Sequence, residues 1–156
     1  MKFVAEKIPL TRLFKTEGAK ELILDYARNG VNPFADKKSS DDEIFESIKE
    51  AYRGKEDNYH SYLFFDENHV PCGLLVFWTV YDEHVRGIVA EVDSIFSTEE
   101  SRKKGCGAVI IQTLKKEARN VGCRGIYLCT PYGTELSDAL AKRFLPVFQI
   151  SYMRVM

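Results

Sequence analysis

Residues 94–108 (SIFSTEESRKKGCGA) place a β-type segment before an Arg-x-x-Gly-x-Gly sequence that leads directly into an amphipathic helix. Gly105 and Gly107 lack the Cβ atoms that would keep a phosphate away from the backbone. A helix that begins here points its first unpaired N–H groups at an anion. Arg102 and the two lysines after it add positive charge. The segment therefore predicts a pocket for a pyrophosphate.

Other phosphate-binding sequences fit this segment less well. A Rossmann fingerprint needs a third glycine at the position of Ile110. The chain also contains no Gly-x-x-x-x-Gly-Lys-Ser/Thr sequence, which a P-loop requires. We therefore exclude NAD chemistry and nucleotide hydrolysis. The alternative that stays open is a surface turn that precedes a helix by chance.

Length and composition indicate one domain, residues 1–156, because 156 residues with 45% hydrophobic side chains suit a single sizeable core. The net charge of -1 gives no general attraction to nucleic acid or to a membrane surface, so we expect neither as a partner. No segment approaches the roughly 20 apolar residues that span a bilayer, and the N-terminal sequence lacks the apolar core of a signal peptide. We expect a cytoplasmic protein.

The cysteines and histidines give no pattern of metal ligands, and we predict no metal. Cys72, Cys106, Cys123 and Cys129 include no Cys-x-x-Cys pair. We interpret them as reduced packing residues, with Cys106 partly exposed. The three histidines are scattered among strand ends and turns, where we expect them in solvent.

Hydrophobic spacing predicts the element order β, α, α, β, β, β, α, β, α, β. Ser40 and Glu43 have the spacing of a capping box at the start of the second helix. The three consecutive strands in the middle read as an antiparallel meander. The expected strands are residues 2–10, 60–65, 70–80, 85–96, 125–130 and 147–155, and the expected helices begin near residues 19, 41, 107 and 134.

This strand, loop and helix, after a meander and before a buried strand, resemble the acetyl-CoA site of the GNAT (general N-acetyltransferase) superfamily. The likeness at the level of sequence lies in residues 89–130. It implies an α+β fold with a mixed, mainly antiparallel twisted sheet of about six strands, helices on both faces and a shortened C-terminal hairpin. It also implies direct transfer of an acetyl group from acetyl-CoA, as cosubstrate, to a primary amine.

The resemblance also implies where acetyl-CoA would bind. The pyrophosphate would lie on the backbone N–H groups of residues 102–108, and the pantetheine arm between strands 85–96 and 125–130, which splay apart. Backbone groups of residues 95–97 would bind the arm and stabilise the thioester oxygen as it gains charge. Members of the superfamily carry an Asn after the fifth strand, and this chain has a Thr at position 130 instead. The hydroxyl of this Thr would replace part of the contact that the Asn makes. The cofactor-binding residues expected on this basis are Ile95, Phe96, Ser97, Arg102, Lys103, Lys104, Gly105, Cys106, Gly107, Ala108 and Thr130.

Acetyl transfer needs a base, because an amine with a pKa of about 10 is mostly protonated and cannot attack. Glu91 is the first candidate, since it stands eleven residues before Arg102 and resembles the general-base glutamate of the histone-acetylating branch of the superfamily. Asp93 is the second candidate and is expected on the same face of the strand. The alternative for both is a solvated or structural carboxylate.

The acid that would protonate the leaving thiolate is a third expected role. Many members of the superfamily carry a Tyr near the end of the last helix, where this chain has Phe144. Tyr132 is the nearest substitute, and Tyr127 lies within the preceding strand. Both tyrosines could instead serve packing, and a thiolate of low pKa needs no acid.

The acceptor site is expected around the first two helices, where aromatic side chains would line it: Tyr26, Phe34, Tyr52 and Tyr59. Residues 36–57 carry eight acidic and five basic side chains, a net charge of -3, which favours a cationic amine from a small molecule or a protein. The short C-terminal tail would leave one wall open to a protein substrate or to a second subunit of a homodimer. Two alternatives stay open: a GNAT fold that binds CoA as a sensor or interaction module, and a structural protein with a vestigial loop.

Overall fold

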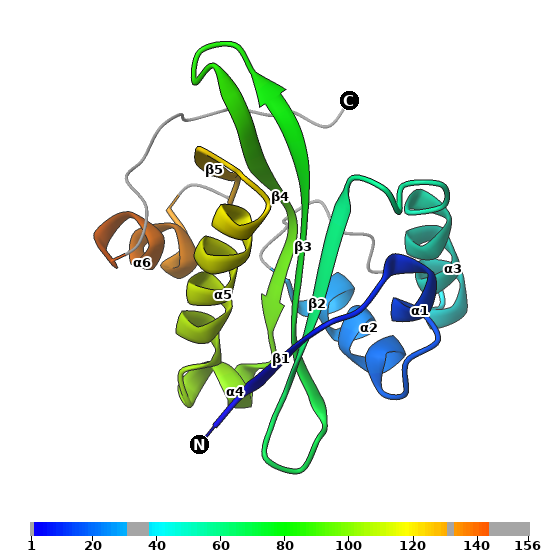
Figure 1. Cartoon of the computed structure of the whole chain (residues 1–156). Coiled ribbons are helices and arrows are strands. Elements are labelled where there is room, and N and C mark those ends of the chain that lie inside the picture. Colours follow the sequence, from blue (N-terminus) through cyan, green and yellow to red (C-terminus); the bar gives the residue numbers. More distant parts are fainter. Residues whose placement is uncertain (1, 31–37, 131–132, 144–156) are drawn as a thin grey trace.

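The computed structural model describes residues 2–30, 38–130 and 133–143, which form five strands and six helices (Figure 1). The strands are β1 (Val4–Lys7), β2 (Tyr59–Phe65), β3 (Pro71–Asp82), β4 (Gly87–Ser97) and β5 (Gly125–Leu128). The helices are α1 (Leu10–Leu13), α2 (Ala19–Asn29), α3 (Asp41–Ala51), α4 (Glu99–Lys103), α5 (Cys106–Asn120) and α6 (Glu135–Arg143).

The strands form one sheet in the order β1-β2-β3-β4-β5. The pairing of β2, β3 and β4 is antiparallel, as the predicted meander requires. The first strand, β1, also pairs antiparallel with β2, and β5 pairs parallel to β4. The described sheet has five strands rather than six. The strand expected at residues 147–155, with the shortened hairpin, lies outside the described residues. The mixed, mainly antiparallel α+β fold is confirmed.

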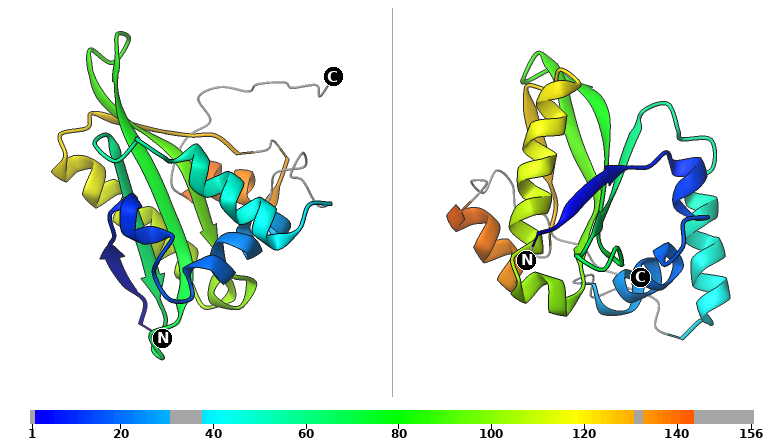
Figure 2. Two further views of the ribbon diagram at one scale, coloured as in Figure 1. Left: turned by 90° about the vertical axis from the view of Figure 1, so that its right-hand side faces the viewer. Right: turned by 60° about the horizontal axis from the view of Figure 1, so that its bottom comes forward.

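Helices cover both faces of the sheet (Figures 1 and 2). On one face, α5 packs its apolar side on β3 and β4 through buried residues such as Ile110 and Leu114. On the other face, α1, α2 and α3 enclose a second core that includes Leu63, Leu74 and Phe96. The sheet therefore separates two apolar cores, and any side chain of β4 belongs to one face or the other.

Local signals explain where several helices begin. The capping box before α3 is confirmed, since Ser40 accepts from the Glu43 amide over 3.3 Å and Glu43 accepts from the Ser40 amide over 2.8 Å. Two short helices were not predicted. Pro9 occupies the N-cap position of α1, and the Thr98 side chain caps α4, so residues 99–103 are helical rather than a loop.

A β-bulge interrupts the pairing of β3 with β4 at Asp93. Val76 lies opposite Ser94 and Phe77 lies opposite Val92, so Asp93 is an extra residue in β4. Bulges of this kind change the direction of side chains along a strand. Here Ala90 and Val92 contact the core under α5, as does Ile95 after the bulge.

The pairing of β4 with β5 ends before β4 does. Val92 lies opposite Leu128, the last residue of β5, whereas β4 continues to Ser97. Along the described chain, the last five residues of β4 therefore have no strand partner on the side of β5. This edge is where the two strands were expected to separate.

Two predictions about cysteines are corrected. Cys106 is not partly exposed: it has no exposed surface, because the first turn of α5 presses it against the strand that carries Cys72. Cys129 is exposed rather than packed. Within the described segments, no group of His, Cys, Asp and Glu side chains could hold a metal ion.

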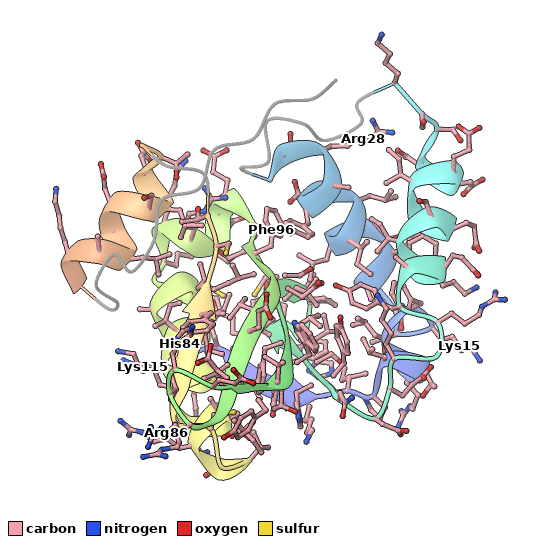
Figure 3. The ribbon with its side chains drawn as sticks, turned by 90° about the horizontal axis from the view of Figure 1, so that it is seen from above. Lys15, Arg28, His84, Arg86, Phe96 and Lys115 are labelled. Atoms are coloured by element: carbon pink, nitrogen blue, oxygen red, sulfur yellow. The ribbon has the colours of Figure 1, made fainter. Side chains whose placement is uncertain are left out.

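Two histidines are packed more closely than expected. His60 stacks on Phe77 at 4.9 Å between ring centroids, and burial lowers its pKa. His69 stacks on Phe65 at 4.5 Å, whereas His84 is exposed in the turn between β3 and β4 (Figure 3). None of the helices in the described parts of the chain is long and apolar enough to cross a membrane.

Candidate active site

The turn between α4 and α5 leaves the start of α5 without a cap. Gly105 occupies the N-cap position with a φ of 94°, a left-handed conformation that favours glycine, and as a glycine it has no side chain to cap the first turn. Of the first three N–H groups of α5, that of Ala108 donates to the Gly105 carbonyl oxygen over 3.2 Å, whereas those of Cys106 and Gly107 have no backbone partner among the described residues. The turn can therefore offer these donors to an anion.

The two glycines of the turn border open space. A Cβ atom built at Gly105 or at Gly107 would meet no other atom within 4 Å. Both residues line a cavity, so the space that their missing side chains leave belongs to this cavity. A phosphate could approach the backbone here without displacing any protein atom.

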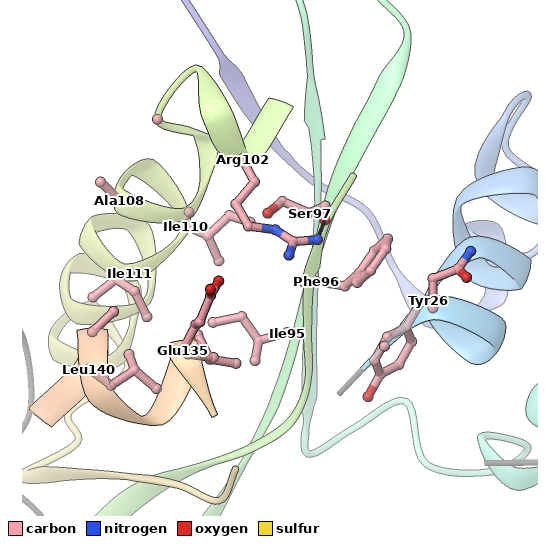
Figure 4. Close-up of a pocket in the computed structure, with 16 residues that line it drawn as sticks. Tyr26, Ile95, Phe96, Ser97, Arg102, Ala108, Ile110, Ile111, Glu135 and Leu140 are labelled. Carbon is pink, nitrogen blue, oxygen red and sulfur yellow. Dashed lines mark hydrogen bonds between the residues drawn. The ribbon is translucent and has the colours of Figure 1, made fainter. Parts of the chain in front are cut away.

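The cavity has a volume of about 530 Å³ and lies between α2, the end of β4, the α4–α5 turn and α6 (Figure 4). It brings together seven of the predicted cofactor-binding residues: Ile95, Phe96, Ser97, Arg102, Gly105, Gly107 and Ala108. Other walls come from α2 and α6: Tyr26 was expected in the acceptor site, whereas Asn29, Glu135 and Leu140 were not predicted to line any site. Spacing along the chain gives no signal for these residues, because they come from distant elements.

Among the described residues that line the cavity, Arg102 is the basic one. Its guanidinium donates to the Ser97 carbonyl oxygen over 3.0 Å, and Figure 4 shows it pointing into the same space as the Glu135 carboxylate. Lys103 and Lys104 do not line the cavity, and each pairs with a glutamate of α4, over 2.6 and 2.5 Å. Cys106, buried behind the turn, and Thr130 also lie outside the lining.

The two candidate bases lie on the face of the sheet that carries α1, α2 and α3. Ala90 and Val92 contact the opposite core, so alternation directs Glu91 to this face. The bulge brings Asp93 to the same face, where its carboxylate accepts a hydrogen bond from the Tyr52 hydroxyl just after α3. The expectation that both carboxylates share one face agrees with this arrangement.

Aromatic rings surround these carboxylates. Tyr52 and Tyr59 lie 5.7 Å apart, and Tyr59 stacks on Trp78 at 6.1 Å. Burial raises the pKa of Tyr59, and the charges of Asp93 and Glu91 raise it further. Trp78 was missed because its position opposite Glu91 depends on the register of β3 and β4. Tyr26 lines the cavity instead, with its ring 5.4 Å from Phe96, and Phe34 lies outside the described residues.

A family model described as the Acetyltransferase (GNAT) family matches residues 20–145, which is most of the chain. The chain belongs to the GNAT acetyltransferase family. Members of this family use acetyl-CoA, and the cavity described above lies at the segment that carries the family resemblance. A comparison with curated protein sequences gives no match.

Solved structures share the GNAT fold at low sequence identity. The ribosomal-protein-alanine N-acetyltransferase of Brucella melitensis is 15% identical, with 99% of each chain covered and a TM-score of 0.71. AAC(6')-Iy, in complex with a bisubstrate analogue, is 17% identical over 100% of this chain and 99% of its own, with a TM-score of 0.67. The glucosamine-6-phosphate N-acetyltransferase of Arabidopsis thaliana is 15% identical over 98% and 99%, with a TM-score of 0.64.

Two further residues considered for this GNAT protein, Tyr127 and Thr130, do not line the cavity. Tyr127 donates to Asp82 over 2.9 Å at the base of the β3–β4 hairpin, a hydrogen bond that raises the pKa of Tyr127. Tyr132 lies outside the described residues. The hydroxyl oxygen of Thr130 is buried, and none of the described residues hydrogen-bonds to it.

Proposed function

We propose that this GNAT protein transfers an acetyl group from acetyl-CoA to a primary amine of a small molecule or a protein. The observation that carries the proposal is the cavity at which the start of α5, with glycine at its N-cap, meets the end of β4, whose β5 side has no strand partner within the described chain. Its volume falls within the range of about 300–1,000 Å³ that is usual for ligand sites. We infer that it receives part of the coenzyme.

The glycine turn suits the pyrophosphate of CoA. The first N–H groups of α5 would donate to its oxygens, and the open space at Gly105 and Gly107 would admit them. Arg102 would add a positive charge in the wall of the same cavity. An anionic group is the ligand that this combination of donors favours.

The unpaired edge of β4 suits the pantetheine arm. Residues 95–97 line the cavity and have no strand partner on the side of β5 within the described chain. Their backbone groups would bind the amides of the arm much as a strand binds a neighbouring strand. One of their N–H groups would then stabilise the thioester oxygen as it gains charge.

A direct reaction of the two substrates is the mechanism that we favour. The related AAC(6')-Iy structure holds a bisubstrate analogue in which CoA is joined to an acetylneamine derivative. A fold that holds such a molecule can hold donor and acceptor together. In this chain Glu91 and Asp93 lie on one face of β4, a few residues before the cavity, and either could take a proton from the amine.

A thermal-shift titration with acetyl-CoA tests the donor site. Ligand at one hundred times its Kd stabilises a protein by about 2.7 kcal/mol, so the melting temperature should rise with concentration. No rise at millimolar acetyl-CoA in folded protein would overturn the proposed donor. Release of CoA thiol should then be followed with a panel of amines: neamine, glucosamine 6-phosphate and a peptide with an N-terminal alanine. Binding without turnover on a broadened amine panel would favour the CoA-binding module instead.

A further inference from the structure

Asp93 is held differently from Glu91. As the extra residue of the β-bulge, Asp93 pairs with no residue of β3, whereas Glu91 lies opposite Trp78 in β3 and Tyr127 in β5. The Asp93 side chain is exposed, and that of Glu91 is half-buried. Bulges often direct a side chain toward a functional site. The backbone therefore singles out Asp93.

Two hydroxyl groups hold one oxygen of Asp93. The Tyr52 hydroxyl donates to Oδ2, and the Ser94 hydroxyl lies 3.1 Å from the same atom. The Tyr52 and Ser94 hydroxyl oxygens are also 3.0 Å apart, so hydrogen bonds link all three side chains to one another. No residue in the described parts of the chain hydrogen-bonds to Oδ1. The carboxylate is thus anchored through one oxygen, and the other is open to a ligand.

Tyr52 is itself fixed in place. Its ring lies 6.0 Å from Phe14 and 5.7 Å from Tyr59, and its backbone closes the C-terminal end of α3. Burial raises the pKa of Tyr52, and the charge of Asp93 raises it further, so the hydroxyl stays a neutral donor at physiological pH. A rigid donor limits the positions that the carboxylate can adopt.

We propose that Tyr52 is a positioning residue that holds Asp93 as the proton acceptor of acetyl transfer. The proposal rests on the function proposed above. The open oxygen of Asp93 takes a proton from the substrate ammonium, and the neutral nitrogen attacks the thioester carbon of acetyl-CoA. The new C–N bond forms as the C–S bond breaks. The second proton of the nitrogen passes to the leaving thiolate, and Asp93 returns its proton to water.

The position of Asp93 along β4 supports this choice over Glu91. Asp93 stands two residues after Glu91 on β4. Because a strand rises about 3.3 Å per residue, Asp93 is closer than Glu91, by roughly 7 Å, to the residues at the end of β4 that line the cavity. Glu91 has no comparable network among the described residues. It remains close enough to the same aromatic rings to attract a cationic substrate.

Two variants and a matched control test the proposal. Tyr52→Phe removes the hydroxyl and keeps the ring, and kcat should fall by about tenfold or more with little change in the Kd of acetyl-CoA. Asp93→Asn should lower kcat by about a hundredfold. Tyr62→Phe is the control, because it also removes a hydrogen bond from a buried tyrosine to a carboxylate, Glu117, over 3.1 Å on the other face of the sheet. Its kcat should stay within about twofold, because Tyr62 does not line the cavity and shares no hydrogen-bond partner with Asp93.

The double variant separates positioning from a general loss of structure. Once Asp93 is replaced by Asn, Tyr52→Phe should cause no further fall in kcat, because the two residues act as a unit. The proposal is wrong if Tyr52→Phe lowers kcat by the same factor in both backgrounds, or if Glu91→Gln has the large effect and Asp93→Asn does not. If Tyr52→Phe does not fold, Ser94→Ala can take its place, because it removes the second hydroxyl that holds Asp93. Its effect on kcat would again be compared with and without Asp93→Asn. A parent protein with no turnover of any amine would overturn the proposed function itself, and the role of Asp93 with it.

Discussion

The Arg102 guanidinium donates a hydrogen bond to the Ser97 carbonyl oxygen over 3.0 Å, which joins α4 to the end of β4 at the wall of the cavity. The contact leaves the positive charge beside the glycine turn. One residue thus links the two elements that the proposed donor site needs, the edge of β4 and the start of α5.

Arg102→Ala should weaken the binding of acetyl-CoA by about tenfold, because a charge-assisted hydrogen bond to phosphate contributes roughly 1.5 kcal/mol or more. The measurement is isothermal titration calorimetry. Arg124→Ala is a matched control, since Arg124 also donates to a backbone carbonyl oxygen, that of Arg86 over 2.9 Å, at the β3–β4 hairpin. Equal effects of the two substitutions would contradict the role given to Arg102.

Gly107→Ala should change stability and binding in opposite directions. The new methyl group meets no protein atom and replaces a glycine within α5, so the free energy of unfolding should rise by up to about 1 kcal/mol. The same methyl group enters the space proposed for the pyrophosphate, and the affinity for acetyl-CoA should fall. Thermal unfolding with and without acetyl-CoA measures both effects. Unchanged affinity in the stabilised variant would argue against a phosphate at this position.

Gly105→Ala should behave differently, although its Cβ also meets no atom. With φ at 94°, alanine would be strained, and the free energy of unfolding should fall by about 1–2 kcal/mol. Chemical denaturation of the two variants separates backbone strain at Gly105 from occupation of the cavity at Gly107. A stabilised Gly105→Ala protein would show that the turn differs from the one described.

His60 should make the fold sensitive to acid. Burial lowers its pKa in the folded state, with a further contribution from Lys7, so the unfolded chain binds a proton more readily. The stability that neutral His60 supplies is therefore complete above a pH of about 6.5 and is lost as the pH falls through the lower pKa of the folded state. His60→Phe keeps a ring to stack on Phe77 and removes this loss. Denaturation curves of the two proteins from neutral pH to pH 5 should diverge, and parallel curves would contradict the prediction.

Local signals in the sequence were enough for part of the fold and of the site. The spacing of Ser40 and Glu43 predicted the start of a helix, and Gly105 and Gly107 predicted the turn that borders the cavity. These features depend on residues close together in the chain, where backbone geometry leaves few choices. Hydrophobic spacing also predicted the order of the longer elements, but it missed the short helices α1 and α4.

Features that depend on contacts between residues far apart in the chain could not be predicted from the sequence. The bulge at Asp93 arises from the register of β3 against β4, and this register also sets Trp78 opposite Glu91. The burial of Cys106 depends on how closely α5 approaches β3. The partnership of Tyr52 with Asp93 joins residues 41 positions apart, and no spacing rule connects them.

Transfer of a labelled acetyl group is the most direct test of the account. Protein incubated with [¹⁴C]acetyl-CoA and an amine should release CoA thiol and place an equal amount of label on the amine, and Asp93→Asn should slow both by about a hundredfold. Label that stays on CoA across a broad panel of primary amines, in protein that binds acetyl-CoA, would contradict the proposed transfer.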